Sequence, residues 1–235
     1  MKKLGLIGGM GPESTIPYYH NIVYGVQKAV GKSMFPELTI ESVNVFKVLK
    51  YCEEKNYNEL TEYLMIAINN LANSGAEFAV LSANTPHIVF DRIKEASPIP
   101  LISIVEATCN EAMKRGYKKI GLLGTVFTMT EDFFKSPFIK NGIQIIIPSQ
   151  NEIEMINEKI STELELGIIK NETLVQFQDV INRMKNDNGI EAIILGCTEL
   201  PLLLNGNVTS IPCLDTMKIH IDTIVNEILD FWFKF

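Results

Sequence analysis

The sequence predicts an α/β protein made of two pseudo-symmetric domains, each a doubly wound parallel sheet. Short apolar runs alternate with helical patterns along the chain, and this alternation is typical of parallel sheets covered by helices. The chain also matches itself twice at nearly the same displacement: residues 2–8 resemble residues 118–124, and the run that leads to Ala83 resembles the run that leads to Cys197. Repetition of this kind predicts two similar halves, with their strand ends facing each other across one active-site cleft.

Apolar runs and turn residues define the elements of the first half. Pro12 suits the first turn of a helix, Gly75 suits the end of one, and Pro86 suits the opening of the next. The expected order is strand 3–8, a helix from residue 12, strand 38–44, helix 56–73, strand 77–82, helix 86–96 and strand 101–104.

The second half is expected to repeat this plan. Its elements are helix 105–115, strand 119–124, a polar loop over 125–130 that leads into a helix, strand 143–147, helices 151–166 and 171–187, the strand before Cys197, a loop over 201–206, strand 211–215 and helix 216–233. We expect the last helix to return to the first half. The expected domains are therefore residues 1–100 together with 212–235, and residues 101–211.

The composition excludes several classes of protein. The chain has 235 residues, of which 46% are hydrophobic and 21% charged, as in ordinary globular proteins. A net charge of −7 argues against nucleic acid or an anionic membrane as a partner. No apolar run reaches the roughly 20 residues of a membrane-spanning helix. The four cysteines have neither paired nor metal-ligand spacing, so we expect a cytoplasmic protein with no metal site.

Cys197 is the main candidate for chemistry. It follows an apolar, β-branched run, so it should lie at the carboxyl edge of a parallel sheet, where open α/β folds place their sites. Backbone N–H groups of the following turn are expected to lower the pKa of its thiol. An inert, buried thiol is the alternative, and it is the interpretation we adopt for the other three cysteines.

Four motifs resemble those of the aspartate/glutamate racemase family, the cofactor-independent amino-acid racemases. They lie in this order along the chain: residues 8–15 (GGMGPEST), 83–87 (ANTPH), 124–125 (GT) and 196–200 (GCTEL). The resemblance implies an isomerase of two α/β domains, often a homodimer, with a small amino acid as substrate and no cofactor. In that family one cysteine from each half flanks the α-carbon of the substrate, one removing the α-proton and the other supplying a proton to the opposite face.

The resemblance implies roles for particular residues of this chain. Cys197 is expected to be one acid/base, and the partner position holds Ala83. The residues expected to bind the substrate are Met10, Gly11, Asn84, Thr85, Thr125, Thr198 and Glu199. Each polar residue among them has an alternative role as a helix cap, Thr85 before Pro86 above all.

Ala83 cannot exchange a proton, so three interpretations stay open. The chain is a divergent racemase, a single-cysteine enzyme such as a decarboxylase, or a catalytically impaired amino-acid-binding homologue or variant in which the thiol is replaced. A hydroxyl of Ser82 or Thr85 would relay a proton only with help from His87 or water.

Charged residues also depart from the family pattern. Where members that bind acidic side chains carry a basic residue, residues 163–167 read ELELG, and near residue 47 a lysine stands where an arginine is expected. Glu165, if it faces the site, favours a neutral or cationic substrate; a solvated helix face is the alternative.

Overall fold

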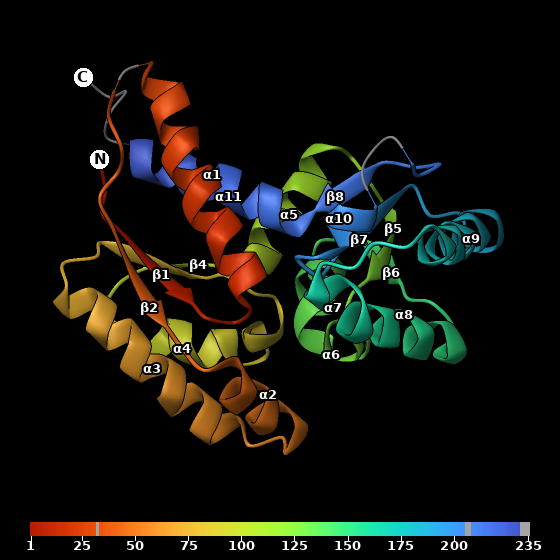
Figure 1. The fold of residues 1–235 in the computed structure, drawn as a ribbon, viewed down its shortest axis with the longest axis horizontal. Helices are drawn as coiled ribbons and strands as arrows, with labels where there is room; N and C mark the ends of the chain where they lie inside the picture. The colour runs from red at the N-terminus through yellow and green to blue at the C-terminus, as the bar shows by residue number, and fades with distance from the viewer. Residues whose placement is uncertain (32, 205–207, 231–235) are drawn as a thin grey trace. The chain divides into compact units, whose positions relative to one another are not determined.

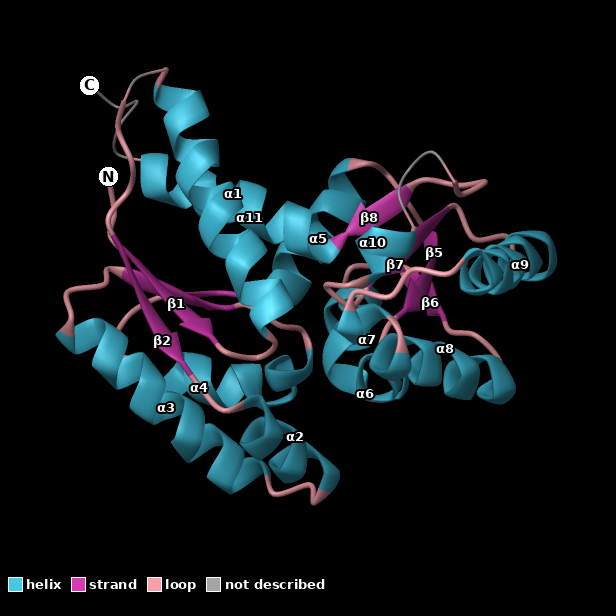
Figure 2. Cartoon of the chain, in the orientation of Figure 1, coloured by secondary structure: helices cyan, strands magenta, loops and turns pink. Residues whose placement is uncertain are grey.

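The computed structural model describes residues 1–31, 33–204 and 208–230 (Figure 1). They form two compact units, the first made of Met1–Ile104 and the chain from His220 onward, the second of Val105–Ile219. Figure 2 shows the strands of each unit together with their helices. No helix among the described residues is long and apolar enough to cross a membrane.

The first unit contains a four-stranded parallel sheet of order β2-β1-β3-β4. Helices α1 and α11 lie on one side of it, and α3 and α4 on the other (Figure 1). The elements are β1 (Leu4–Gly8), α1 (Pro12–Val30), β2 (Leu38–Ser42), α2 (Val45–Glu53), α3 (Tyr57–Asn73), β3 (Phe78–Leu81), the 3₁₀ helix η1 (Thr85–Val89), α4 (Phe90–Ala96), β4 (Leu101–Ile102) and most of α11 (Thr216–Leu229).

The second unit contains a parallel sheet of order β6-β5-β7-β8, which is the strand order of the first sheet repeated. Its elements are α5 (Ile104–Lys114), β5 (Lys119–Leu123), α6 (Val126–Thr130), α7 (Asp132–Lys140), β6 (Gln144–Ile146), α8 (Gln150–Thr162), the 3₁₀ helix η2 (Leu164–Leu166), α9 (Asn171–Asn188), β7 (Ala192–Leu195), α10 (Leu200–Leu203) and β8 (Cys213–Asp215). The repeated order explains the two internal sequence matches.

Burial explains why the central strands form where they do. Every residue of β1, β3 and β7 is buried, because a strand inside a doubly wound sheet is covered on both faces. The edge strands β2 and β6 contain only partly buried and exposed positions. The continuous apolar runs in the sequence therefore mark the strands at the middle of each sheet.

The units divide a few residues away from the expected domain boundaries. The structure ends the first segment at Ile104 and keeps the chain through Ile219 in the second unit. The cause is β8, which pairs with β7 through partners that include Leu195 and Asp215. From His220 onward α11 packs in the first unit, where Lys2 and Glu227 form an ion pair.

Three short helices lie where the sequence analysis expected none. Helix α2 is capped by Asn44, whose side chain accepts a hydrogen bond from the Phe46 N–H at 3.0 Å. Helix α6 occupies the expected polar loop, and α10 occupies the start of the expected loop over 201–206. The expected helix 151–166 is instead α8 followed by η2, and residues 205–207 and 231–235 of the expected elements lie outside the described residues.

Candidate active site

Cys197 and Thr125 lie after the ends of two neighbouring strands of the second sheet. β5 pairs with β7 as far as Leu123 and Leu195, and one glycine follows each strand. The strand order reverses between β5 and β7, and this switch point is where open α/β sheets bind their ligands. The structure therefore brings both predicted residues to the edge that suits a site.

Gly196 allows the thiol to lie close to β5. Its N–H donates to the Leu123 carbonyl oxygen at 2.7 Å, and a Cβ at this position would lie 2.8 Å from that same oxygen. Only glycine fits such a close approach of two backbones without displacement.

The thiol of Cys197 is buried and bonded to a carboxylate. Sγ donates a hydrogen bond to Glu199 Oε2 at 2.9 Å, and the Thr198 hydroxyl donates to the same oxygen at 2.9 Å. Cys197 is 8% exposed and Glu199 is 7% exposed. The structure thus places three predicted site residues in one hydrogen-bonded group.

The expectation of a lowered thiol pKa is wrong. Burial raises the pKa of Cys197 well above its ordinary value, and the charge and the hydrogen bond of Glu199 raise it further. A backbone hydrogen bond from Glu199 does act in the expected direction, but the burial and the carboxylate outweigh it. The resting form of Cys197 is therefore the thiol, with a proton acceptor already in contact.

Thr125 caps a helix. Its Oγ1 accepts a hydrogen bond from the Thr128 N–H at 3.4 Å and lies 3.2 Å from Thr128 Oγ1, at the start of α6. Thr198 does not cap α10, since the cap position belongs to Glu199 and no side-chain cap bond forms there. The alternative role that we gave to these threonines is thus confirmed for Thr125 alone.

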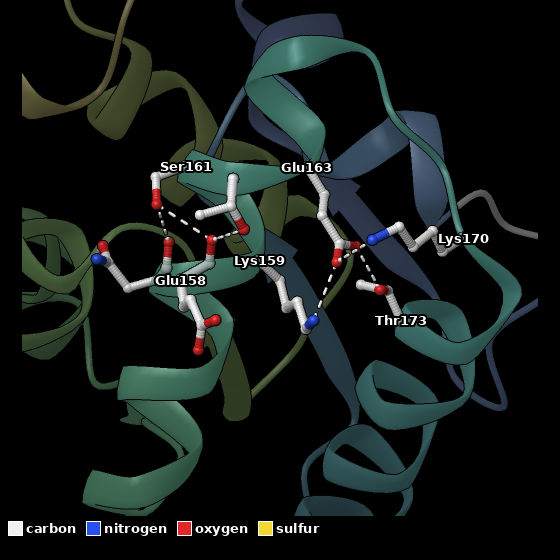
Figure 3. Close-up of polar contacts among 8 residues, drawn as sticks. Glu158, Lys159, Ser161, Glu163, Lys170 and Thr173 are labelled. Atoms are coloured by element: carbon white, nitrogen blue, oxygen red, sulfur yellow. Dashed lines mark hydrogen bonds and ion pairs between the residues drawn. The ribbon is translucent and has the colours of Figure 1, made fainter.

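In the segment after α8, the charge of Glu165 acts on Cys197, and Glu163 lies two residues earlier in the chain. The sequence did not single out Glu163. Glu163 is 3% exposed and accepts hydrogen bonds from Lys159, Lys170 and Thr173 (Figure 3). These bonds lower the pKa of Glu163 to about 2, that of Thr173 most. The acidic residues of this segment suggested a solvated helix face. The burial of Glu163 involves contacts with residues of another helix, such as Thr173 on α9, which the local sequence does not indicate.

The first unit carries its predicted residues at the matching edge of its own sheet. β1 and β3 are neighbours, and Ser82 N donates to the Ile7 carbonyl oxygen at 3.0 Å just before Ala83. The turn after β1 runs through Gly9 and Gly11, with φ of 77° and 103°. Met10, Gly11, Ala83, Asn84 and Thr85 therefore all lie at the carboxyl edge of this sheet.

Thr85 is not the helix cap that the sequence suggested. The 3₁₀ helix η1 begins at Thr85 itself, and Asn84 precedes it with no side-chain cap bond. Thr85 is half-buried, as is Ala83, whereas Asn84 is 5% exposed.

His87 is fixed as a neutral structural residue. Its Nδ1 lies 3.0 Å from the Ala83 carbonyl oxygen and therefore donates, while its Nε2 accepts from the Ile104 N–H at 3.3 Å. Burial lowers the pKa of His87 to about 4. Because both ring nitrogens are engaged with the backbone, the relay through His87 does not form in this structure.

Among the described residues, no three His, Cys, Asp or Glu side chains gather in a way that would hold a metal ion. The candidate site consists instead of a thiol, carboxylates, hydroxyls and backbone groups.

Two doubly wound units with a buried thiol at one switch point form the architecture that the resemblance to racemases implied. A family model described as Asp/Glu/Hydantoin racemase matches residues 7–224. The chain belongs to the Asp/Glu/Hydantoin racemase family.

Characterised relatives and solved structures agree. A broad specificity amino-acid racemase of Bacillus subtilis, RacX, is 26% identical over 217 residues, covering 91% of this chain and 92% of its own. A Yersinia pestis protein assigned as an Asp/Glu racemase has a TM-score of 0.91 and 36% identity, covering 97% of this chain and 100% of that one. An aspartate racemase homologue from Pyrococcus horikoshii has a TM-score of 0.85 and 35% identity, covering 97% and 99%. The predicted family and the α/β fold class are confirmed, and so, at the level of the family, is the class of enzyme.

Proposed function

We propose that this protein is a cofactor-independent amino-acid racemase in which Cys197 exchanges the α-proton of the substrate. The observation that carries the proposal is the buried thiol that donates a hydrogen bond to Glu199 at the switch point of the second sheet. Membership of a racemase family supports the reaction class.

The thiol–carboxylate pair suits proton transfer at carbon. Removal of an α-proton needs a thiolate, and Glu199 is placed to take the proton of Cys197 when the substrate arrives. The α-ammonium group of an amino acid offsets the negative charge of Glu199 and so favours the thiolate. Once the hydrogen of the thiol has been replaced by one from solvent, its transfer to carbon completes one exchange.

The developing charge on the substrate carboxylate requires hydrogen-bond donors. We assign this role to Asn84, Thr85, Thr125 and Thr198, and to the backbone at Met10 and Gly11.

Ala83 favours a second candidate, a single-cysteine enzyme that transfers protons on one face only, as in a decarboxylase. No proton can come from an alanine, and His87 is held neutral by two backbone contacts. If the enzyme is a racemase, the second proton comes from water or from a hydroxyl near Ala83.

The test is α-proton exchange in D₂O, followed by NMR, with both hands of acidic, neutral and basic amino acids. Wild-type protein and Cys197→Ser are compared. Exchange with inversion that disappears in Cys197→Ser supports the racemase. Exchange with retention supports proton transfer on one face only. Decarboxylation of a prochiral malonate to a single enantiomer would establish that alternative. Absence of exchange with every amino acid would exclude the racemase.

The proposal extends to a homodimer in the cytoplasm. All four cysteines, Cys52, Cys109, Cys197 and Cys213, are free thiols, as expected in a reducing compartment. Light scattering on the purified protein tests the dimer, and a monomeric mass would exclude it. Cell fractionation tests the location.

A further inference from the structure

The segment from Glu163 to Lys170, which we call the strap, connects α8 to α9. The buried carboxylate of Glu163 anchors it. Glu163 Oε1 accepts from Lys159 Nζ at 2.9 Å and from Lys170 Nζ at 3.1 Å, and Oε2 accepts from Thr173 Oγ1 at 2.5 Å (Figure 3). Lys159 lies on α8, whereas Lys170 and Thr173 lie at the start of α9. Glu163 therefore joins the two helices across the strap and engages both lysines.

Backbone hydrogen bonds shape the turn within the strap. The Glu163 carbonyl oxygen accepts from the N–H groups of Leu166 at 3.1 Å and Ile168 at 2.9 Å, and Gly167 closes the turn with φ of 70°. Leu164 is fully buried, whereas Glu165 remains exposed. The short helix η2 contacts α10, which begins directly after Glu199. Glu165 is thus presented beside the turn that carries Cys197.

Two carboxylates near the thiol, Glu165 and Glu199, have no cationic partner in the part of the chain that the structure describes. Neither Glu165 nor Glu199 forms an ion pair among the residues that the structure describes, and both Lys159 and Lys170 pair with Glu163. Although the Glu165 residue is exposed, partial desolvation of its carboxyl, followed by the charge of Glu199, raises the pKa of that carboxyl. The charge of Glu165 in turn contributes to the raised pKa of Cys197. The three groups therefore lie within electrostatic reach of one another.

We infer that Glu165 is a specificity-determining residue that selects amino acids with a cationic side chain, and this inference rests on the proposed racemase function. The α-ammonium group of any amino acid offsets one of the two carboxylates, and a basic side chain offsets the other. An acidic side chain would instead add a further negative charge to a site that already holds two, which Coulomb repulsion disfavours.

The chemistry of the thiol points the same way. Cys197 must lose its proton to act as a base, and two neighbouring carboxylates oppose that loss. A ligand with two positive charges relieves this opposition more than a ligand with one. A cationic substrate is therefore favoured in binding and also in the ionisation that starts the reaction.

Calorimetric binding of L-lysine, L-norleucine and L-glutamate tests the inference independently of turnover. The side chain of norleucine is that of lysine without its terminal ammonium group, so it has nearly the same shape and no charge. We expect lysine to bind about tenfold more tightly than norleucine, and glutamate to bind most weakly. Glu165→Gln should lower the lysine preference about fivefold, and Glu165→Lys should bring glutamate above lysine.

Glu158→Gln is the matched control, because Glu158 is an exposed carboxylate on α8 of the same unit and should leave the preference unchanged (Figure 3). Tightest binding of glutamate by the wild-type protein, or an unchanged preference in Glu165→Gln, would overturn the inference. Added salt should reduce the lysine preference, as for any partly exposed charge pair.

Exchange in D₂O is measured on the same samples. Binding in the expected order without exchange would refute the proposed racemase but keep the selectivity, whereas exchange of glutamate in preference to lysine would do the reverse. Absence of binding by all three amino acids would overturn both.

Discussion

Cys197 and Glu199 are joined by a hydrogen bond of 2.9 Å from Sγ to Oε2, two residues apart in the turn after β7. The contact makes the thiol a weak acid at rest and places its proton acceptor within reach. The same carboxylate oxygen also accepts from the Thr198 hydroxyl, so its orientation is fixed by two donors. Reactivity of the thiol should therefore depend on Glu199 as well as on burial.

Replacing Glu199 with glutamine should make Cys197 more reactive. The substitution removes the charge that raises the pKa of the thiol, so the thiolate fraction at pH 8 increases. We expect the rate of alkylation by iodoacetamide to rise about tenfold, which corresponds to a pKa lower by about one unit. Mass spectrometry should follow Cys197 separately, because Cys213 is half-buried and also a free thiol. Glu158→Gln is the control, and equal rates in the two variants would disprove the dependence.

Replacing Ala83 with cysteine should increase inversion relative to exchange. The substitution supplies a thiol at the position that corresponds to Cys197 in the repeated strand order. Ala83 is half-buried, so one sulfur atom should fit with little loss of stability. The ratio of inversion to exchange is read by chiral chromatography after incubation in D₂O.

Ala83→Ser is the matched control for that experiment. Its hydroxyl has a similar size but a pKa far from neutral, so it should give no comparable gain. An equal gain in the serine and cysteine variants would show that volume, and not the thiol, is responsible.

The strands were predictable because their sequence carries a strong local signal. Runs such as residues 192–195 are apolar throughout, and the structure buries all of them. The short helices α2 and α6 were missed because their start depends on single caps, Asn44 and Thr125, that also suit loops. The geometry of the cap decides whether such a residue starts a helix or lies in a loop.

The candidate site was predictable in identity but not in electrostatics. Cys197 and Glu199 were singled out from the motif, yet the direction of the thiol pKa depends on burial that only packing produces. Glu163 gives the same lesson, since its neighbours Lys170 and Thr173 join it only when α9 folds back beside α8. Contacts between neighbouring helices leave no local pattern in the sequence.

The first unit should lose stability in mild acid because of two buried, neutral histidines. His220 accepts from the Tyr18 hydroxyl at 2.8 Å through Nδ1 and donates to the Ile102 carbonyl oxygen at 3.2 Å through Nε2. Burial lowers the pKa of His87 to about 4 and that of His220 to about 3. Below pH 6.5 the unfolded chain protonates both histidines, whereas the folded chain keeps them neutral. This contribution to stability is therefore present above pH 6.5 and falls as the pH decreases toward 4.

Each histidine should cost about 2 kcal/mol between pH 7 and pH 4.5, from the difference between its folded and unfolded pKa values. Urea unfolding, combined with amide exchange in β3 and β4, measures the loss in the first unit. His87→Gln should flatten the pH dependence, whereas His20→Gln, on the exposed face of α1, should not. Glu163 affects the stability in a lower pH range than the histidines do, since its pKa is held at about 2. A loss of stability that begins only below pH 4 would contradict the role of the histidines.

Replacing Gly196 with alanine should destabilise the second unit and displace Cys197. The new Cβ would lie 2.8 Å from the Leu123 carbonyl oxygen and 2.9 Å from Thr128 Cγ2. The carbonyl cannot retreat without breaking the 2.7 Å bond that it accepts from Gly196 N. We expect a loss of about 1–3 kcal/mol in the free energy of unfolding, as for other overpacked sites.

Two further variants separate backbone from side-chain crowding at this position. Thr128→Ser in the Gly196→Ala background removes the methyl contact but leaves the contact with the Leu123 oxygen, so little stability should return. Gly25→Ala is the control: its Cβ would meet only the Val225 side chain, at 3.0 Å and above, and alanine is the better helix former. Full recovery on Thr128→Ser would mean that the methyl group, and not the backbone of β5, requires glycine beside the thiol.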